Sequence, residues 1–238
     1  MKQHTTAQAS SGALFATPFS AGYWRHAASE VPKTRMLTVT ALLCALCALI
    51  DMFFVPIGGT FLRVYFSFLI AGLLCTVCGP VLALPAGFLV DTLSFLFSGG
   101  DPSGYFPGYA LSSMLSFLIY ALFFYRAPLL SLSRIFAARL CVNVFINVIL
   151  GSVWKHILYG NAYIVYFVSG AIKNLAILPI EAALMLFLYR RLLPVLQRAG
   201  FVSSAVTVSV RRRDYIFSAV SALAGAAVLL AYYFYKNP

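Results

Sequence analysis

Long apolar stretches recur along this chain, and they constrain its fold more than any other feature of the sequence. Helices are predicted at about residues 36–54, 63–78, 80–98, 109–125, 133–157 and 168–190, with a seventh at 215–235. An apolar helix of roughly 20 residues crosses a bilayer, although the second stretch is short and ends at Gly79 and Pro80. The alternation typical of a transmembrane β-strand is absent. The sequence therefore predicts an all-α, polytopic membrane helical bundle.

The composition supports the same class. Of 238 residues, 62% are hydrophobic and 10% are charged, and the mean hydropathy is +0.91. A soluble core of this size could not bury so much apolar surface. We expect a flexible cytoplasmic tail (1–35), a six-helix membrane domain (36–192), a basic cytoplasmic linker (193–214) and a seventh transmembrane helix (215–238).

The formal net charge of +11 is distributed as a topology signal. Basic residues precede the first helix, flank the fourth and fifth, and follow the sixth: Lys2, Arg25, Lys33, Arg35, Arg126, Arg134, Arg139, Arg190, Arg191, Arg198 and Arg211, Arg212 and Arg213. All of them fall on one side of the membrane if the N-terminus is cytoplasmic, as the positive-inside rule requires. We therefore expect a multi-pass plasma-membrane protein with a cytoplasmic N-terminus, which contacts the lipid bilayer and no nucleic acid.

Polar side chains within the helices gather in the opposite, outer half. Intramembrane charge is costly and usually functional, which gives these candidate binding residues: Arg63, Asp91, Asn143, Asn147, Trp154, Lys155, Lys173 and Asn174. The spacing of Asn143, Asn147 and Trp154 by four and seven places them on one helix face. The other half holds few ionisable groups away from the boundary, so the pattern favours a pocket open to the outside over a channel.

Simpler interpretations of these residues stay open. Arg63 and Lys155 could extend to the membrane boundary as snorkelling side chains. Asn143 and Asn147 could join helices by hydrogen bonds.

The loop GGDPSGYFPGY, residues 99–109, interrupts the apolar sequence. Its glycines and prolines exclude a continuous helix, and it carries Tyr105, Phe106 and Tyr109. A hinged aromatic segment of this kind is typical of a lid that closes on a flat ligand. The alternative is an aromatic belt at the membrane interface.

Two CxxC motifs, Cys44 to Cys47 and Cys75 to Cys78, have the spacing of zinc ligands. Both lie in apolar helices, without nearby polar groups that would hold metal ligands in place. We interpret these cysteines as packing residues and expect no metal site, no cofactor and no disulfide.

Five segments resemble the folate-specific S component of energy-coupling factor (ECF) vitamin importers. They are LTVTALLCALCALID, VPIGGTFLRVYFSFLIAGLLCTVCGP, GYFPGYALSSMLSFLIYALFFY, VNVFINVILGSVWKHILYG and GAIKNLAILPIE. The resemblance covers about residues 36 to 192, and its most specific parts are YFPG, N-x-x-x-N…W and IKNL.

The resemblance implies a six-helix subunit that captures folate or a reduced folate from outside. Transport would then need a membrane coupling subunit and two ABC-type ATPases, and this chain has no phosphate-binding G-x-x-x-x-G-K-[ST] motif of its own. The chain itself is not expected to be an enzyme. In the family an alanine motif on the first helix contacts the coupling subunit, and Ala41, Ala45 and Ala48 match it here. Intramolecular helix packing would explain the same spacing.

Folate chemistry fits the polar residues. The pterin would meet Asp91, Asn147 or Asn174 and stack on Trp154, Tyr105 or Phe106. The anionic glutamate tail would meet Arg63, Lys155 or Lys173, although Lys173 could instead pair with Asp91.

The chain departs from the family in its long N-terminal tail and its extra helix. Three other functions stay open: an S component for thiamine or riboflavin, a solitary secondary transporter, and an intramembrane enzyme. The enzyme is disfavoured because no catalytic helix motif is present, and the solitary transporter because no inner polar path is visible.

Overall fold

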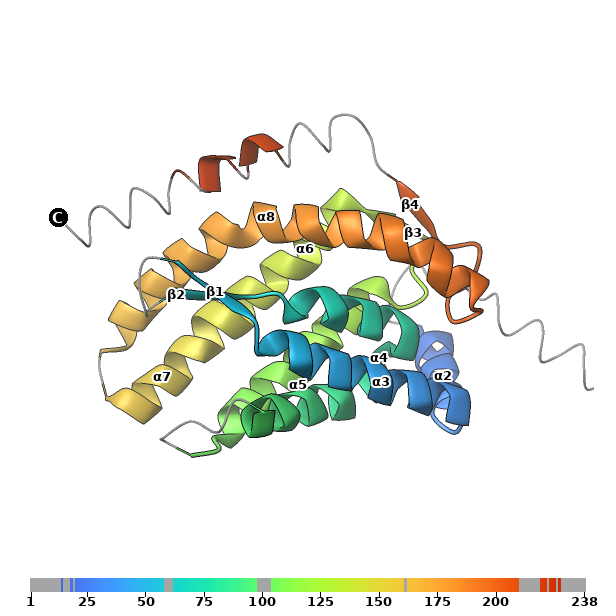
Figure 1. Ribbon diagram of the computed structural model, residues 1–238, viewed down its shortest axis with the longest axis horizontal. Helices are drawn as coiled ribbons and strands as arrows, with labels where there is room; N and C mark the ends of the chain where they lie inside the picture. Colours follow the sequence, from blue (N-terminus) through green and yellow to red (C-terminus); the bar gives the residue numbers. More distant parts are fainter. Residues whose placement is uncertain are drawn as a thin grey trace, which may run out of the picture.

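The protein is a helical bundle (Figure 1). The computed structural model describes residues 14, 18, 20–57, 62–97, 104–160, 162–209, 219–221, 223–225 and 227. The helices are α2 (Ala21–Glu30), α3 (Thr34–Asp51), α4 (Ser67–Phe97), α5 (Pro107–Phe124), α6 (Leu132–Cys141), the π-helix η1 (Val142–Leu150), α7 (Gly151–Tyr159) and α8 (Tyr163–Arg198). Strands β1 (Phe54–Ile57) and β2 (Leu62–Tyr65) pair antiparallel, and β3 (Leu129–Ser131) and β4 (Thr207–Ser209) pair parallel.

Within the described residues, five helices are long and apolar enough to cross a membrane. They are α3, α4, α5, the continuous helix formed by α6, η1 and α7, and α8. This confirms the predicted class of polytopic helical membrane bundle. The predicted helix at 215–235 lies largely outside the described residues, so the number of crossings stays a prediction.

Helix α4 is two helical arms that run back along each other. Gly79 separates them, with φ 71° and ψ 177°. The thiol of Cys47 lies 3.4 Å from the Ser67 carbonyl oxygen, and that of Cys44, one turn away on α3, lies 3.9 Å from the Ala86 carbonyl oxygen. A continuous helix would separate Ser67 from Ala86 by about 28 Å. The chain therefore reverses at Gly79, as predicted from the Gly79–Pro80 break.

The start of the second predicted helix was wrong. Residues 63–65 belong to β2, and the first helical arm begins at Ser67. Likewise α3 ends at Asp51, before the predicted 54. Extended backbone is favoured ahead of Pro56, and β-branched and aromatic residues suit the two strands.

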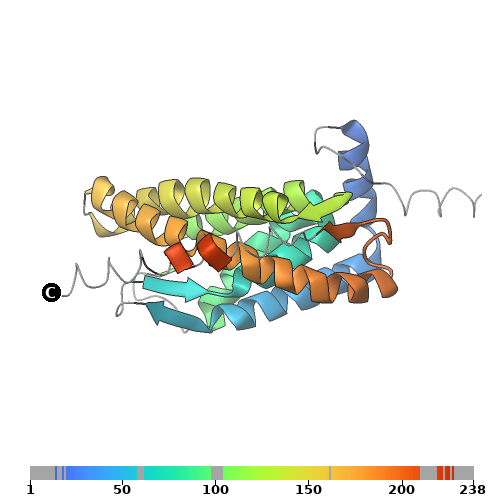
Figure 2. The same cartoon turned by 90° about the horizontal axis from the view of Figure 1, so that it is seen from above.

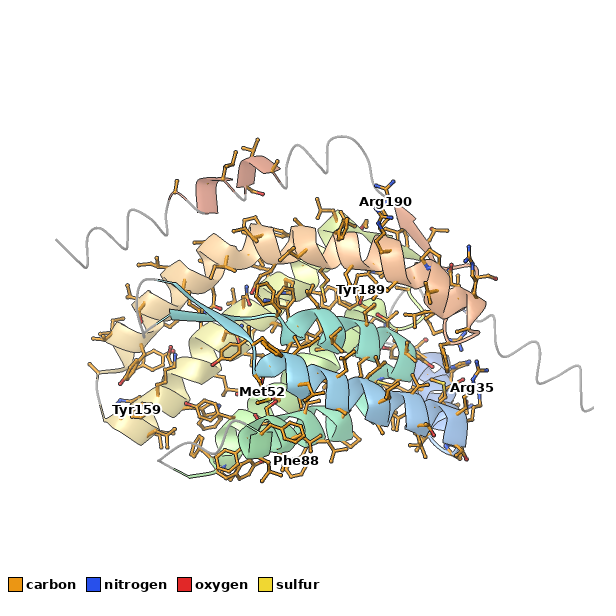
Figure 3. The ribbon with its side chains drawn as sticks, viewed as in Figure 1. Arg35, Met52, Phe88, Tyr159, Tyr189 and Arg190 are labelled. Atoms are coloured by element: carbon orange, nitrogen blue, oxygen red, sulfur yellow. The ribbon has the colours of Figure 1, made fainter. Side chains whose placement is uncertain are left out.

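The two ends of the bundle differ. One end, here the hairpin end, holds β1–β2, the start of α5 and the turn between α7 and α8. The other, the basic end, holds α2, β3 and β4 (Figures 1 and 2). Arg35 and Arg190 lie toward the basic end, and Tyr159 lies at the hairpin end (Figure 3).

Part of the predicted N-terminal tail is folded at the basic end. Ser20 caps α2 by accepting from the Tyr23 amide. The Tyr23 hydroxyl donates to the Ala121 carbonyl oxygen at 2.9 Å, and His26 hydrogen bonds with the Tyr125 hydroxyl at 2.9 Å. These contacts attach α2 to the end of α5.

Candidate ligand site

A buried ion pair lies in the middle of the bundle. Arg139 of α6 is 3% exposed and Glu181 of α8 is 8% exposed, and their side chains form a salt bridge. The Arg139 guanidinium also donates to the Tyr120 hydroxyl and lies 4.2 Å from the centre of the Phe68 ring. Arg139, counted above among the basic residues that flank the helices, is therefore a buried residue of the bundle. Because a buried charge is costly when unpaired, Glu181 makes this position possible.

A chain of amides extends from this ion pair toward the hairpin end. Asn143 Nδ2 donates to Glu181 Oε2 at 2.8 Å and to the Asn174 carbonyl oxygen at 3.2 Å. Asn147 Nδ2 donates to Asn143 Oδ1 at 2.9 Å. Glu181, Asn143 and Asn147 thus form a continuous row of hydrogen-bonded side chains. Both asparagines lie in η1, and π-helical turns occur frequently at functional sites.

The aromatic residues of the predicted lid pack at the hairpin end. Phe106 contacts Trp154 of α7 edge to face, with ring centres 5.5 Å apart, and Tyr109 at 5.6 Å. Trp154 Nε1 donates to Ser112 Oγ of α5 at 2.9 Å. A Cβ added at Gly108 would lie 2.9 Å from Trp154 Cδ2, so glycine permits this close packing.

Tyr105 is directed to a different helix. Its ring centre lies 5.3 Å from that of Phe95, and its hydroxyl lies 3.4 Å from Thr92 Oγ1 of α4. Residues 104–109 thus connect the second arm of α4 with α7. Residues 98–103 of the predicted lid lie outside the described part of the chain.

Three charged residues of the predicted site lie on α4, α7 and α8. Asp91 of α4 accepts from Ser113 Oγ at 3.2 Å. Lys155 of α7 is exposed and Lys173 of α8 is half-buried, and the two ammonium groups lie close enough to repel each other. Lys173 also interacts electrostatically with Glu181. The backbone of Arg63 lies in β2, and its side chain is not among those that the structure describes.

The three alanines of α3 differ in exposure. Ala41 is exposed, Ala45 is half-buried and Ala48 is fully buried. Along the same helix Leu42 is 69% exposed and Leu49 is 48% exposed. Helix α3 therefore presents an apolar face, to which Ala48 contributes no surface.

The buried cysteines and an apolar cavity beside α8 are further features of the bundle. Cys44, Cys47, Cys75 and Cys78 are buried free thiols, and the described residues contain no group of three or more His, Cys, Asp or Glu suited to a metal ion. A cavity of about 350 Å³ lies between α8 and the described C-terminal residues. It is apolar, lined by Ile172, Leu175, Ala176, Pro179, Ser221, Ala224 and Gly225.

Sequence and structure comparisons identify the family. No family model matches the chain. A protein of Clostridium novyi (strain NT) named folate transporter FolT is 32% identical over 130 residues, which span 54% of this chain and 73% of that protein. The chain belongs to the FolT family. A FolT of Leuconostoc mesenteroides subsp. mesenteroides is 26% identical over 160 residues, which span 65% of this chain and 84% of that protein.

A solved FolT structure has the same fold. The crystal structure of FolT bound with folic acid matches with a TM-score of 0.59 and 28% identity, covering 66% of this chain and 93% of that one. The resemblance to a folate-specific S component is thereby confirmed.

Most of the predicted site residues lie on α5, η1, α7 and α8 in a few connected groups. Asn143, Asn147 and Asn174 form one group, and Phe106, Tyr109 and Trp154 form another. Sequence reasoning missed Arg139, Tyr120 and Ser112. Arg139 precedes Asn143 by four residues and thus continues the stripe that contains Asn147, which was the available signal.

Proposed function

We propose that this protein binds folate from the extracellular side and serves as the substrate-binding subunit of an ATP-driven ECF importer. Membership of the FolT family carries the proposal, together with the likeness to a FolT bound with folic acid. ATP hydrolysis would take place on two partner ATPases and reach this chain through a membrane coupling subunit.

The side chains at the hairpin end suit the two parts of folate. Trp154 and Phe106 offer aromatic surfaces for the flat pterin, and Asn147, Asp91 and Asn174 offer hydrogen-bonding groups at different depths. Lys155 and Lys173 bring two like charges together, and binding the glutamate carboxylates between them would relieve their repulsion. The backbone of Arg63 lies in β2, which is also at the hairpin end.

Residues 99–109 would act as the lid. Phe106 packs on Trp154 and Tyr105 packs on Phe95, so the segment contacts both sides of the proposed site. A ligand entering between α4 and α7 would have to displace at least one of these contacts. We expect the lid to open for entry and to reclose over the pterin.

The distribution of charge supports a cytoplasmic basic end. Arg25, Arg35, Arg126, Arg134 and Arg198 lie on or beside the element ends that meet there. By the positive-inside rule, the N-terminus is cytoplasmic and the hairpin end faces outward. The apolar face of α3 around Ala41 and Ala45 would then meet the coupling subunit.

Uptake into vesicles tests the transport mode. Vesicles containing this chain with its coupling subunit and ATPases should accumulate radiolabelled folic acid only when ATP is supplied. Vesicles containing this chain alone should accumulate none. ATP-independent accumulation by the chain alone would instead support a solitary secondary transporter. ATP-driven uptake of thiamine or riboflavin, without folate uptake, would support an ECF importer but contradict folate as its ligand.

A further inference from the structure

The buried hydrogen bonds leave the Asn147 amide only one orientation. Glu181, ion-paired with Arg139, can only accept hydrogen bonds, as can the Asn174 carbonyl oxygen. Both lie against Asn143 Nδ2, at 2.8 and 3.2 Å, so they take both of its hydrogens. The remaining acceptor, Asn143 Oδ1, meets Asn147 Nδ2 at 2.9 Å. Oδ1 of Asn147 is left to accept from another group.

The orientation of the two side-chain amides follows from their hydrogen-bond partners. The oxygen and nitrogen of an asparagine side chain are similar in shape, and their assignment depends on the hydrogen bonds they make. Turning Asn143 over would bring its oxygen against the Glu181 carboxylate and the Asn174 carbonyl, where no donor is available. Turning Asn147 over would place its oxygen against that of Asn143. Two acceptors at the buried end therefore fix both amides.

Asn147 presents this fixed edge to the candidate site. Asn143 is fully buried, whereas Asn147, four residues nearer the hairpin end, is exposed. Because it bonds to Asn143, it lies on the helix face directed to α8 and not on the opposite face. Its Oδ1 and its second Nδ2 hydrogen form an acceptor beside a donor.

We propose that Arg139, Glu181 and Asn143 are positioning residues that fix Asn147 so that it selects a ligand edge with an N–H donor beside a carbonyl acceptor. The inference rests on the proposed function and specifies which edge of the pterin is read. Folic acid carries such an edge at N3–H and O4. In aminopterin an amino group replaces O4 and N3 has no hydrogen, so the donor and acceptor are exchanged. The two compounds share the same glutamate tail.

Calorimetric titration of the purified chain with folic acid and with aminopterin tests the inference. Folic acid should bind about tenfold more tightly or better, since a mismatched buried edge leaves polar groups unpaired. In Asn143→Leu, Asn147 is free to turn over and match either compound, so the affinity ratio should fall toward one. Asn143→Ser, whose hydroxyl both donates and accepts, serves the same purpose if the leucine variant does not fold.

Lys155→Gln is the matched control. It should weaken both compounds equally and leave their ratio unchanged, because they share the tail. Equal binding of folic acid and aminopterin by the unaltered chain would overturn the inference while leaving folate binding intact. So would an unchanged ratio in the Asn143 variants. Binding of neither compound by the unaltered chain would instead contradict the proposed function and, with it, the inference.

Discussion

At the scale of single residues, the buried ion pair of Arg139 and Glu181 is expected to affect the stability of the bundle strongly. Arg139→Met should lower the free energy of unfolding by about 3–5 kcal/mol, because it leaves the buried Glu181 carboxylate without its countercharge. The double variant Arg139→Met/Glu181→Met should recover most of this loss, since it removes both charges. Unfolding in detergent, followed by tryptophan fluorescence, checks the difference. A double variant as unstable as the single one would show that charge pairing is not what stabilises this position.

Trp154 should matter for binding through its ring more than through its N–H. Trp154→Leu removes the contact with Phe106 and should weaken folate binding by about tenfold or more, as stacked bases lose roughly 1–3 kcal/mol on loss of an aromatic partner. Trp154→Phe keeps an aromatic ring and loses only the bond to Ser112, so its effect should be smaller. Binding titration measures both.

The second tryptophan provides the control for this series. Trp24 is 41% exposed on α2, at the basic end. Trp24→Leu should leave folate affinity unchanged. Equal losses in the Trp24 and Trp154 variants would indicate a general loss of folding and contradict a specific role for Trp154.

Sequence alone located polar residues of this region but not their partners. Asn143 and Asn147 were found because four-residue spacing survives in η1, where the two amides still bond. Arg139 was missed because an arginine near a helix start follows the positive-inside pattern equally well. Only the packing of α6 against α8 distinguishes a boundary cation from one paired with Glu181.

At the scale of elements, the reversal at Gly79 holds the two arms of α4 together. Gly79→Ala should be strongly destabilising for two reasons. A φ of 71° is unfavourable for a residue with a side chain, by about 1–2 kcal/mol. A Cβ there would also lie 2.9 Å from the Tyr125 ring.

Gly104→Ala separates these two contributions. Gly104 also has a positive φ, 84°, but an added Cβ would meet nothing within 4 Å. Thermal unfolding of both variants should therefore show a clearly larger loss for Gly79→Ala. Similar losses would mean that Tyr125 moves aside at little cost.

The elements themselves were predictable to different degrees. Apolar length predicted α3, both arms of α4, α5 and α8, and the Gly–Pro pair predicted the break. The β1–β2 hairpin was not predicted because its residues are as apolar as those of the helices on either side. The π-helical turns of η1 leave no mark on hydropathy, since they arise from how the helix packs.

At the scale of the whole molecule, orientation in the membrane is accessible to cysteine labelling. The Tyr159 side chain is 53% exposed at the hairpin end, and Ser29 is exposed on α2. In intact cells, a membrane-impermeant maleimide should label Tyr159→Cys and should label Ser29→Cys only after permeabilisation. The unaltered chain is the control for background, because four of its five cysteines are buried. The reverse pattern would contradict a cytoplasmic N-terminus.

The central claim is that this member of the FolT family binds folate in the region between α4, α7 and α8. The most direct test is calorimetric titration of the purified, detergent-solubilised chain with folic acid, using thiamine and riboflavin as controls. The account predicts tight binding of one folic acid per chain, with no heat from the other two vitamins. A folded chain that gives no heat with folic acid, or that binds thiamine or riboflavin instead, would contradict it.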